Sequence, residues 1–236
     1  APPLWESQLE KARELAKKED DLNAREIYES LLEEEGLGEQ EGEIRQEYED
    51  LNMKLIFSPQ ATPESLFHEV VPGDNLSALA KKYGTTISLL KKSNRLESAD
   101  NIYAGNKLKV PKKHFSLRIK KQENKLVLLA GDQPVKTYSV ATGEDGSTPV
   151  GTFAIVNKLE NPTWDHAGAI VPPDSPKNIL GSRWLGFDKK GYGIHGTTLP
   201  ESIGHHSTSG CVRMLNNEVE ELYDLVPSGT KVTVLP

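Results

Sequence analysis

The sequence predicts a multidomain chain, with an α-helical module at residues 1–57, a small α+β module of βααβ order at 66–112 and a mainly β domain at 113–236. Three observations lead to this fold class. Apolar residues recur every three to four positions in the first segment, which is typical of amphipathic helices. Strand, turn and helix signals alternate in the second segment, and apolar and polar residues alternate along the third. A chain of 236 residues is also longer than one average domain.

Three helices are expected before residue 58. Their apolar positions are Trp5, Leu9, Ala12 and Ala16, then Ala24, Ile27, Tyr28, Leu31 and Leu32, and finally Ile44, Tyr48, Leu51 and Leu55. Asn23 is placed to cap the second helix, with Glu26 three residues on and Gly36 to end it. The segment faintly resembles a tetratricopeptide hairpin but has fewer repeats than a solenoid needs. We expect a spacer, or a docking module for a protein partner.

Charge is unevenly distributed. Residues 1–60 hold 17 Asp and Glu against 7 Lys and Arg, a net charge of −10. The whole chain carries −7, so residues 61–236 carry +3. An acidic helical segment before a weakly basic body indicates a solvated helix face and argues against nucleic-acid binding. No apolar run approaches the ~20 residues of a membrane span. The first residues show neither an initiator Met nor the apolar core of a signal peptide, as expected of an exported chain whose targeting segment has been removed.

Residues 58–65, "SPQATPES", read as a linker. A strand is then expected at Phe67–Val71, and Asp74 is placed to cap a helix that carries Leu76, Leu79 and Ala80. Gly84 should end that helix, Thr86 should cap a second one, and residues 108–110 should form the closing strand.

The stretches "VVPGDNLSALAKKYGTTISLLKKSN" and "IYAGNKLKVP" resemble the LysM domain, a βααβ module that binds glycans containing N-acetylglucosamine. The resemblance covers almost all of residues 66–112. It implies that the glycan lies between the first strand–helix loop and the second helix–strand loop. The positions carried over are Gly73, Asp74, Asn75, Leu76, Asn101, Ile102 and Tyr103, of which Asp74 could equally be a plain N-cap and Leu76 a core residue.

The β domain contains turn signals at Glu123-Asn124 and Gly131-Asp132, and one helix is expected at residues 217–225. The single cysteine of the chain, Cys211, follows the small polar stretch "STSG". A lone cysteine is usually a buried small hydrophobe, but this setting favours a thiol nucleophile that needs a basic partner. His195, at the end of a strand "GYGIH", His205 and His206 are the candidates. An inert thiol, or a zinc site of these residues, is disfavoured by the polar setting and by spacings that fit no common tetrahedral pattern.

Four stretches resemble the catalytic domain of the L,D-transpeptidases, the YkuD family, in the order "ATGEDGSTPVGTFAI", "NILGSRWLGF", "GIHGT" and "STSGCVRM". The resemblance runs over the whole of residues 114–236. It implies that Cys211 is the nucleophile and His195 its base, with the carbonyl of Gly196 orienting the imidazole. Backbone N–H groups of Gly210 and Cys211 would form an oxyanion hole. Arg213 would hold the pocket or a substrate carboxylate, since a guanidinium binds carboxylates bidentately.

The resemblance further implies substrate contacts from Trp184, Tyr192, Thr208 and Ser209. A departure lies at Ser209, where the family often has a histidine. His205 or His206 could replace that side chain, or both could be loop residues. No metal or other cofactor is implied.

The implied reaction is the formation of 3→3 cross-links in peptidoglycan through a cysteine thioester, by an enzyme of the bacterial cell envelope, periplasm or cell wall, that carbapenems inhibit. Three alternatives remain: an L,D-carboxypeptidase that passes the same acyl group to water, a sortase-like transpeptidase, and a glycan-binding protein with an inactive β domain. The close spacing of Cys211 and Arg213 and the stretches "TPVGTF" and "HGT" speak against the sortase, and the intact set of His195, Cys211 and Arg213 against the inactive protein. The acceptor amine is left open: a second stem, a lipoprotein lysine or a free D-amino acid.

Overall fold

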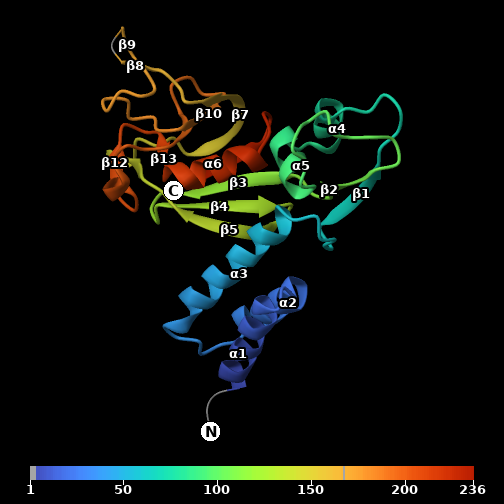
Figure 1. Cartoon of the computed structure of the whole chain (residues 1–236). Coiled ribbons are helices and arrows are strands. Elements are labelled where there is room, and N and C mark those ends of the chain that lie inside the picture. Colours follow the sequence, from blue (N-terminus) through green and yellow to red (C-terminus); the bar gives the residue numbers. More distant parts are fainter. Residues whose placement is uncertain (1–3, 167) are drawn as a thin grey trace. The chain divides into compact units, whose positions relative to one another are not determined.

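The computed structural model describes residues 4–166 and 168–236, and Figure 1 shows the order of their elements. Three helices come first, α1 (Leu4–Lys17), α2 (Asp21–Leu32) and α3 (Gln40–Ile56). Their expected apolar faces form the core of this module, in which Ala12, Ala24, Leu31 and Ile44 are fully buried. The expected cap was wrong: α2 begins two residues before Asn23, whose amide instead donates to the carboxylate of Asp20. The helix also ends at Leu32, before Gly36.

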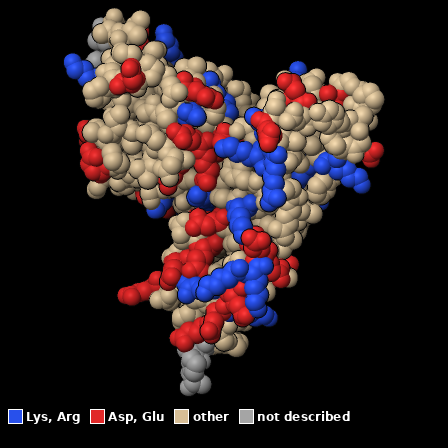
Figure 2. Space-filling model, in the orientation of Figure 1, with Lys and Arg blue, Asp and Glu red and all other residues tan. Residues whose placement is uncertain are grey.

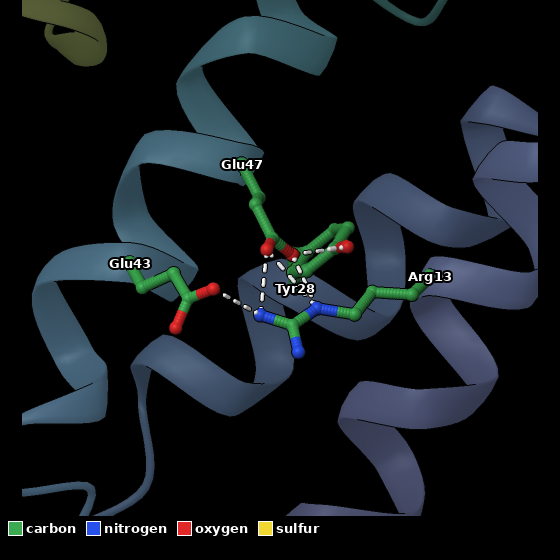
Figure 3. A network of polar contacts seen from close by, with 4 residues as sticks. All are labelled: Arg13, Tyr28, Glu43 and Glu47. Carbon is green, nitrogen blue, oxygen red and sulfur yellow. Dashed lines mark hydrogen bonds and ion pairs between the residues drawn. The ribbon is translucent and has the colours of Figure 1, made fainter.

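A polar network ties the three helices together (Figure 3). The guanidinium of Arg13 on α1 donates from Nη2 to Glu43 (2.8 Å) and to Glu47 (2.6 Å) on α3. The hydroxyl of Tyr28 on α2 donates to the other oxygen of Glu47 (2.6 Å). Acidic and basic side chains are interspersed over these helices in Figure 2, so the surplus of acid is a solvated and partly paired surface.

The four elements of the LysM-like stretch are β1 (Ser65–Glu69), α4 (Leu76–Tyr83), α5 (Ile87–Ser93) and β2 (Lys107–Pro111), and β1 pairs antiparallel with β2. The residue that caps α4 is Asn75, whose side chain accepts the N–H of Ala78, and not Asp74. Thr86 caps α5 through the N–H of Leu89 (2.9 Å), as expected. Gly84 ends α4 in the left-handed conformation.

The β domain is built on an eight-stranded sheet of order β13-β11-β10-β7-β14-β3-β4-β5. Its strands are β3 (Phe115–Lys120), β4 (Lys125–Ala130), β5 (Gln133–Ser139), β7 (Gly151–Glu160), β10 (Arg183–Phe187), β11 (Gly193–His195), β13 (Val212–Arg213) and β14 (Lys231–Leu235). Neighbours run antiparallel except the pairs β11–β13 and β14–β3. Outside this sheet, β6 (Thr142–Gly143) pairs in parallel with β12 (His206–Thr208), and β8 (Trp164–His166) pairs with β9 (Ala169–Val171).

Helix α6 (Asn216–Leu225) contacts β10 and β11 and buries Val219, Leu222 and Leu225. Two single-turn helices, η1 (Glu144–Gly146) and η2 (Pro200–Ser202), lie in the loops. The fold class is therefore confirmed: N-terminal helices, a βααβ unit and a mainly β domain.

The described chain folds as two compact units. One consists of residues 1–73 and 90–112, and the other of 74–89 and 113–236. In the first, the buried side chain of Lys109 on β2 donates to the carbonyls of Leu55 and Ser58 at the end of α3. In the second, Ser88 donates to the carboxylate of Asp224 on α6 (2.6 Å). The units divide the 66–112 stretch between them, so the domain boundaries stay a prediction.

Candidate active site

A cavity of about 530 Å³ lies in the second unit, and both His195 and Cys211 line it. Its walls are formed by Leu159, Pro162, Thr163, Trp164, Asp165, Ile179, Leu180, Trp184, Gly191, His195, Ser207, Thr208, Ser209, Cys211 and Arg213. These residues come from β7, β8, β10, β11, β12 and β13 and from the loops between them. The sheet thus brings together two chemical groups that lie sixteen residues apart in the sequence.

His195 ends β11 and is almost completely buried. Its Nδ1 lies 2.7 Å from the carbonyl oxygen of Gly196. Because a carbonyl can only accept, Nδ1 carries the hydrogen and Nε2 is left with the lone pair that a base needs. The ring of Trp184, the cross-strand partner on β10, stacks on the imidazole at 6.0 Å. Burial lowers the pKa of His195 to about 4, although the hydrogen bond to Gly196 acts in the opposite direction.

Cys211 stands between β12 and β13, with its thiol donating to the carbonyl of Gly191 (3.4 Å). Burial raises the pKa of the thiol, and the backbone of Gly193 and the positive charge of Arg213 only partly oppose this shift. At neutral pH the site therefore holds a neutral thiol and a neutral imidazole. A pair of this kind works by proton transfer during attack, rather than from a preformed thiolate.

The turn before the nucleophile is held by Thr208. Its hydroxyl oxygen accepts the N–H of Gly210 (3.2 Å) and donates to the carbonyl of Cys211 (2.6 Å). Gly210 has φ 128°, a conformation that favours glycine. The N–H of Gly210, expected to serve an oxyanion hole, thus has Thr208 as its partner in this structure. It would have to exchange or share that hydrogen bond to bind an oxyanion.

The stretch "ATGEDGSTPVG" packs against this turn. Thr148 is fully buried and accepts the N–H of Gly143 (2.8 Å). A Cβ added at Gly143 would lie 3.0 Å from the Cα of Gly210 and 2.7 Å from the backbone nitrogen of Thr148. The motif therefore positions the nucleophile through close backbone packing.

Arg213 is the cross-strand partner of His195 in the parallel pair β11–β13. One guanidinium nitrogen, Nη1, donates to the hydroxyl of Ser202 (2.9 Å). Its Nε is buried and has no hydrogen-bond partner among the described residues. Arg213 also lines the cavity, where a guanidinium is suited to bind an anionic group.

The structure brings together most of the residues expected at the site. Trp184, Thr208 and Ser209 line the cavity, whereas Tyr192 is not among the described lining residues. Tyr192 packs behind Gly210, where an added Cβ would come within 2.7 Å of its ring. His206 is exposed and its Nδ1 pairs with the hydroxyl of Thr142 (2.8 Å), so it is fixed to β6 rather than aimed at the thiol.

The positions expected to bind glycan are divided between the two units. Asp74, Asn75 and Leu76 belong to one, and Gly73, Asn101, Ile102 and Tyr103 to the other. Tyr103 is 68% exposed, as a sugar contact requires, whereas Leu76 is 1% exposed and its side chain belongs to the core. Their joint use in glycan binding stays a prediction.

Three residues at or near the site carry no signal that sequence reasoning could use. Gly191 contributes a backbone carbonyl, and Ser202 contributes a hydroxyl from a loop. Asn216 bonds the backbone beyond His195 through its side-chain amide. In each of these contacts at least one partner is a backbone group or a residue in a loop, which no sequence pattern marks.

In the parts of the chain that the structure describes, no group of three or more His, Cys, Asp and Glu side chains is placed to hold a metal ion. The described helices include none that is both long and apolar enough to cross a membrane.

Two family models match the chain. Residues 68–111 match the LysM domain, and residues 115–234 match the YkuD family, described as the L,D-transpeptidase catalytic domain. The second match covers half of the chain and contains every residue of the cavity.

Two relatives from Bacillus bear L,D-transpeptidase names. YqjB of Bacillus subtilis is 42% identical over 49% of this chain and 68% of its own length. YkuD of Bacillus licheniformis is 34% identical over 72% of this chain and 99% of its own length. Among solved structures, an L,D-transpeptidase from Mycobacterium smegmatis matches at 17% identity and a TM-score of 0.45, over 56% of this chain and 64% of that one.

Proposed function

Because the chain belongs to the YkuD family of L,D-transpeptidases and carries a LysM domain ahead of the catalytic domain, we propose that it forms 3→3 cross-links in peptidoglycan through a thioester on Cys211. The observation that carries the proposal is the cavity on which Cys211, His195 and Arg213 meet, with Nδ1 of His195 bound to the carbonyl of Gly196. This arrangement supplies a nucleophile, an oriented base and a fixed positive charge.

In the first half-reaction, Sγ of Cys211 attacks the carbonyl carbon of the amide that follows the third residue of a stem tetrapeptide. The thiol proton passes to Nε2 of His195 and then to the departing amine, so the C–N bond breaks and D-alanine leaves. Arg213, which lines the cavity, binds the carboxylate of the donor stem. The neutral state of His195 and Cys211 at rest suits this order of proton transfers.

In the second half-reaction, the side-chain amine of a neighbouring stem attacks the thioester carbon. His195 accepts a proton from that amine and returns it to the sulfur, which leaves as the restored thiol. Water can attack the same thioester, and the result would then be an L,D-carboxypeptidase. The cavity has apolar walls at Leu159, Trp164 and Trp184, and the products decide between the amine and water as acceptor.

LysM and YkuD domains together imply binding to peptidoglycan and a place in the cell envelope. We further propose that the LysM domain holds the glycan while the catalytic domain searches nearby stems, in the periplasm or cell wall. The domain carries nine Lys and Arg against four Asp and Glu over residues 66–113, and this charge suits the acidic stems of the wall.

The test is the product analysis of purified muropeptides by mass spectrometry. The wild-type protein should release D-alanine and produce dimers joined 3→3, and Cys211→Ala should yield neither while keeping its thermal transition. A carbapenem should add one drug mass at Cys211, because its strained lactam mimics the acyl donor. D-alanine release without dimers would identify a carboxypeptidase, and activity that survives Cys211→Ala would end the thiol mechanism.

A further inference from the structure

The backbone that follows His195 is held at every polar group from the carbonyl of His195 to that of Thr197. The N–H of Met214 donates to the carbonyl of His195 (2.8 Å), and the N–H of Gly196 donates to the carbonyl of Arg183 (3.2 Å). Both groups of Thr197 are bound by one side chain, Asn216. The N–H of Thr197 donates to Oδ1 (3.0 Å), and Nδ2 donates to the carbonyl of Thr197 (2.9 Å).

The remaining group of this segment is the carbonyl of Gly196, which accepts from Nδ1 of His195. That carbonyl and the N–H of Thr197 belong to one planar trans peptide unit, in which the two bonds point in opposite directions. When Oδ1 of Asn216 fixes the N–H, it also fixes the direction of the carbonyl. The amide of Asn216 and the imidazole of His195 therefore bind opposite sides of the same peptide.

Two glycines leave room for this amide. A Cβ at Gly196 would lie 2.1 Å from Oδ1 of Asn216, and one at Gly181 would lie 2.2 Å from the same atom. Oδ1 also accepts the N–H of Ser182 (3.2 Å), so that the first residue of α6 joins the start of β10 to the loop after β11. The absence of a side chain at both positions is therefore what lets the amide approach the backbone this closely.

We propose that Asn216 is a positioning residue for the base: it acts through the Gly196–Thr197 peptide to hold the imidazole of His195 in its working orientation and tautomer. Asn216 lies outside the cavity wall and does not touch the reacting atoms. The proposal deepens the proposed function and rests on His195 being its base.

The test is the rate of carbapenem acylation at Cys211, followed by mass spectrometry across pH, in the full chain. Asn216→Ala removes both hydrogen bonds to Thr197. A small misplacement of a catalytic group can lower a rate by ~10²-fold. Because water can replace some of the hydrogen bonds of this exposed amide, we expect acylation to slow by about tenfold. Since Asn216 is an exposed residue, this variant should keep its fold.

Asn216→Asp keeps the acceptor for the N–H of Thr197 but loses the donor to its carbonyl. It should therefore restore part of the acylation rate that Asn216→Ala loses. A role confined to stability would give both folded variants the wild-type rate.

Asn94→Ala is the matched control. In the other unit, Asn94 binds both backbone groups of Lys109, accepting its N–H (2.7 Å) and donating to its carbonyl (2.9 Å), as Asn216 does for Thr197. Asn94→Ala should leave acylation at the wild-type rate. The proposal is overturned if folded Asn216→Ala acylates as fast as the wild type, or if Asn94→Ala slows as much. Should Asn216→Ala fail to fold, a folded Asn216→Asp that acylates as fast as the wild type overturns it instead.

The two proposals fail separately. A wild-type protein that acylates with carbapenem but neither releases D-alanine nor joins stems would refute the proposed function. The effect of Asn216 on acylation would stand in that case.

Discussion

At the scale of single residues, the surroundings of the imidazole of His195 decide its charge. It is buried under Trp184 and beside Arg213, and both burial and that positive charge favour its neutral form. A base must be neutral to accept a proton, so the same surroundings would suit the proposed role of His195 at any pH well above 4. Burial raises the pKa of the Cys211 thiol, so in the proposed mechanism the thiol would give up its proton only as the new bond forms.

This setting predicts an unusual pH profile. Because the pKa of His195 is lowered to about 4 from its ordinary value of 6.5, carbapenem acylation should stay level from pH 8 down to about 5 and fall only below that. A profile that falls with a midpoint near 6.5 would show that the imidazole is solvated, contrary to the structure.

The pH dependence of the free energy of unfolding should also reflect the titration of His195. Between pH 6.5 and about 4 the unfolded chain binds a proton at His195 that the folded chain does not, so the free energy of unfolding should decrease as the pH falls through this window, by up to about 3 kcal/mol. Urea unfolding at pH 7 and pH 4.5 measures the loss. In His195→Gln, which cannot titrate, the part of the loss due to this residue should vanish.

At the scale of elements, the nucleophile depends on backbone packing between β6 and the turn before β13. Gly143→Ala should slow acylation at least tenfold and cost about 1–3 kcal/mol of stability, because the new methyl group meets the backbone of Thr148 and Gly210. Acylation rates and thermal melting measure the two effects.

The matched control is Gly42→Ala, on an exposed face of α3 where an added Cβ has no atom within 4 Å. It should leave acylation unchanged and stabilise the chain by about 0.5–1 kcal/mol, since alanine is the better helix former. Equal acylation in the two variants would mean that Gly143 does not position the nucleophile.

The sequence predicted elements better than their ends. The three helices, the βααβ order and the strand that ends in His195 follow from periodicity, which reflects burial. The caps did not follow so well: Asn75 and not Asp74 caps α4, because two adjacent short polar side chains can both reach a free N–H and the path of the preceding loop decides between them. The contacts of Asn216 could not be predicted from the sequence either, since its partners are backbone groups that the sheet brings near.

For the whole molecule, the sequence predicts that the LysM domain retains the enzyme on the wall. Among the large apolar and aromatic residues that are expected to contact glycan, Tyr103 is the most exposed. Tyr103→Ala should weaken retention on insoluble sacculi about tenfold, because it removes roughly one aromatic ring stacked on a sugar. It should leave the turnover of small soluble muropeptides unchanged. Cosedimentation and product analysis measure the two quantities.

Leu4→Ala is a suitable comparison, because Leu4 is 71% exposed and lies on α1, outside the LysM domain. It should retain the enzyme as the wild type does. If Tyr103→Ala lowers soluble turnover as much as retention, the LysM domain would be acting on the catalytic step and not as a tether.

The two compact units are interlaced along the chain, since residues 74–89 belong with 113–236 and residues 90–112 belong with 1–73. During synthesis, the first unit has all of its residues once position 112 is made, whereas residues 74–89 must wait for the β domain that follows. Their contacts are distant in sequence and therefore slow to form. The boundary between the units falls at Leu89 and Leu90, which are buried within α5, so a protease could cut the chain there only after that helix had opened.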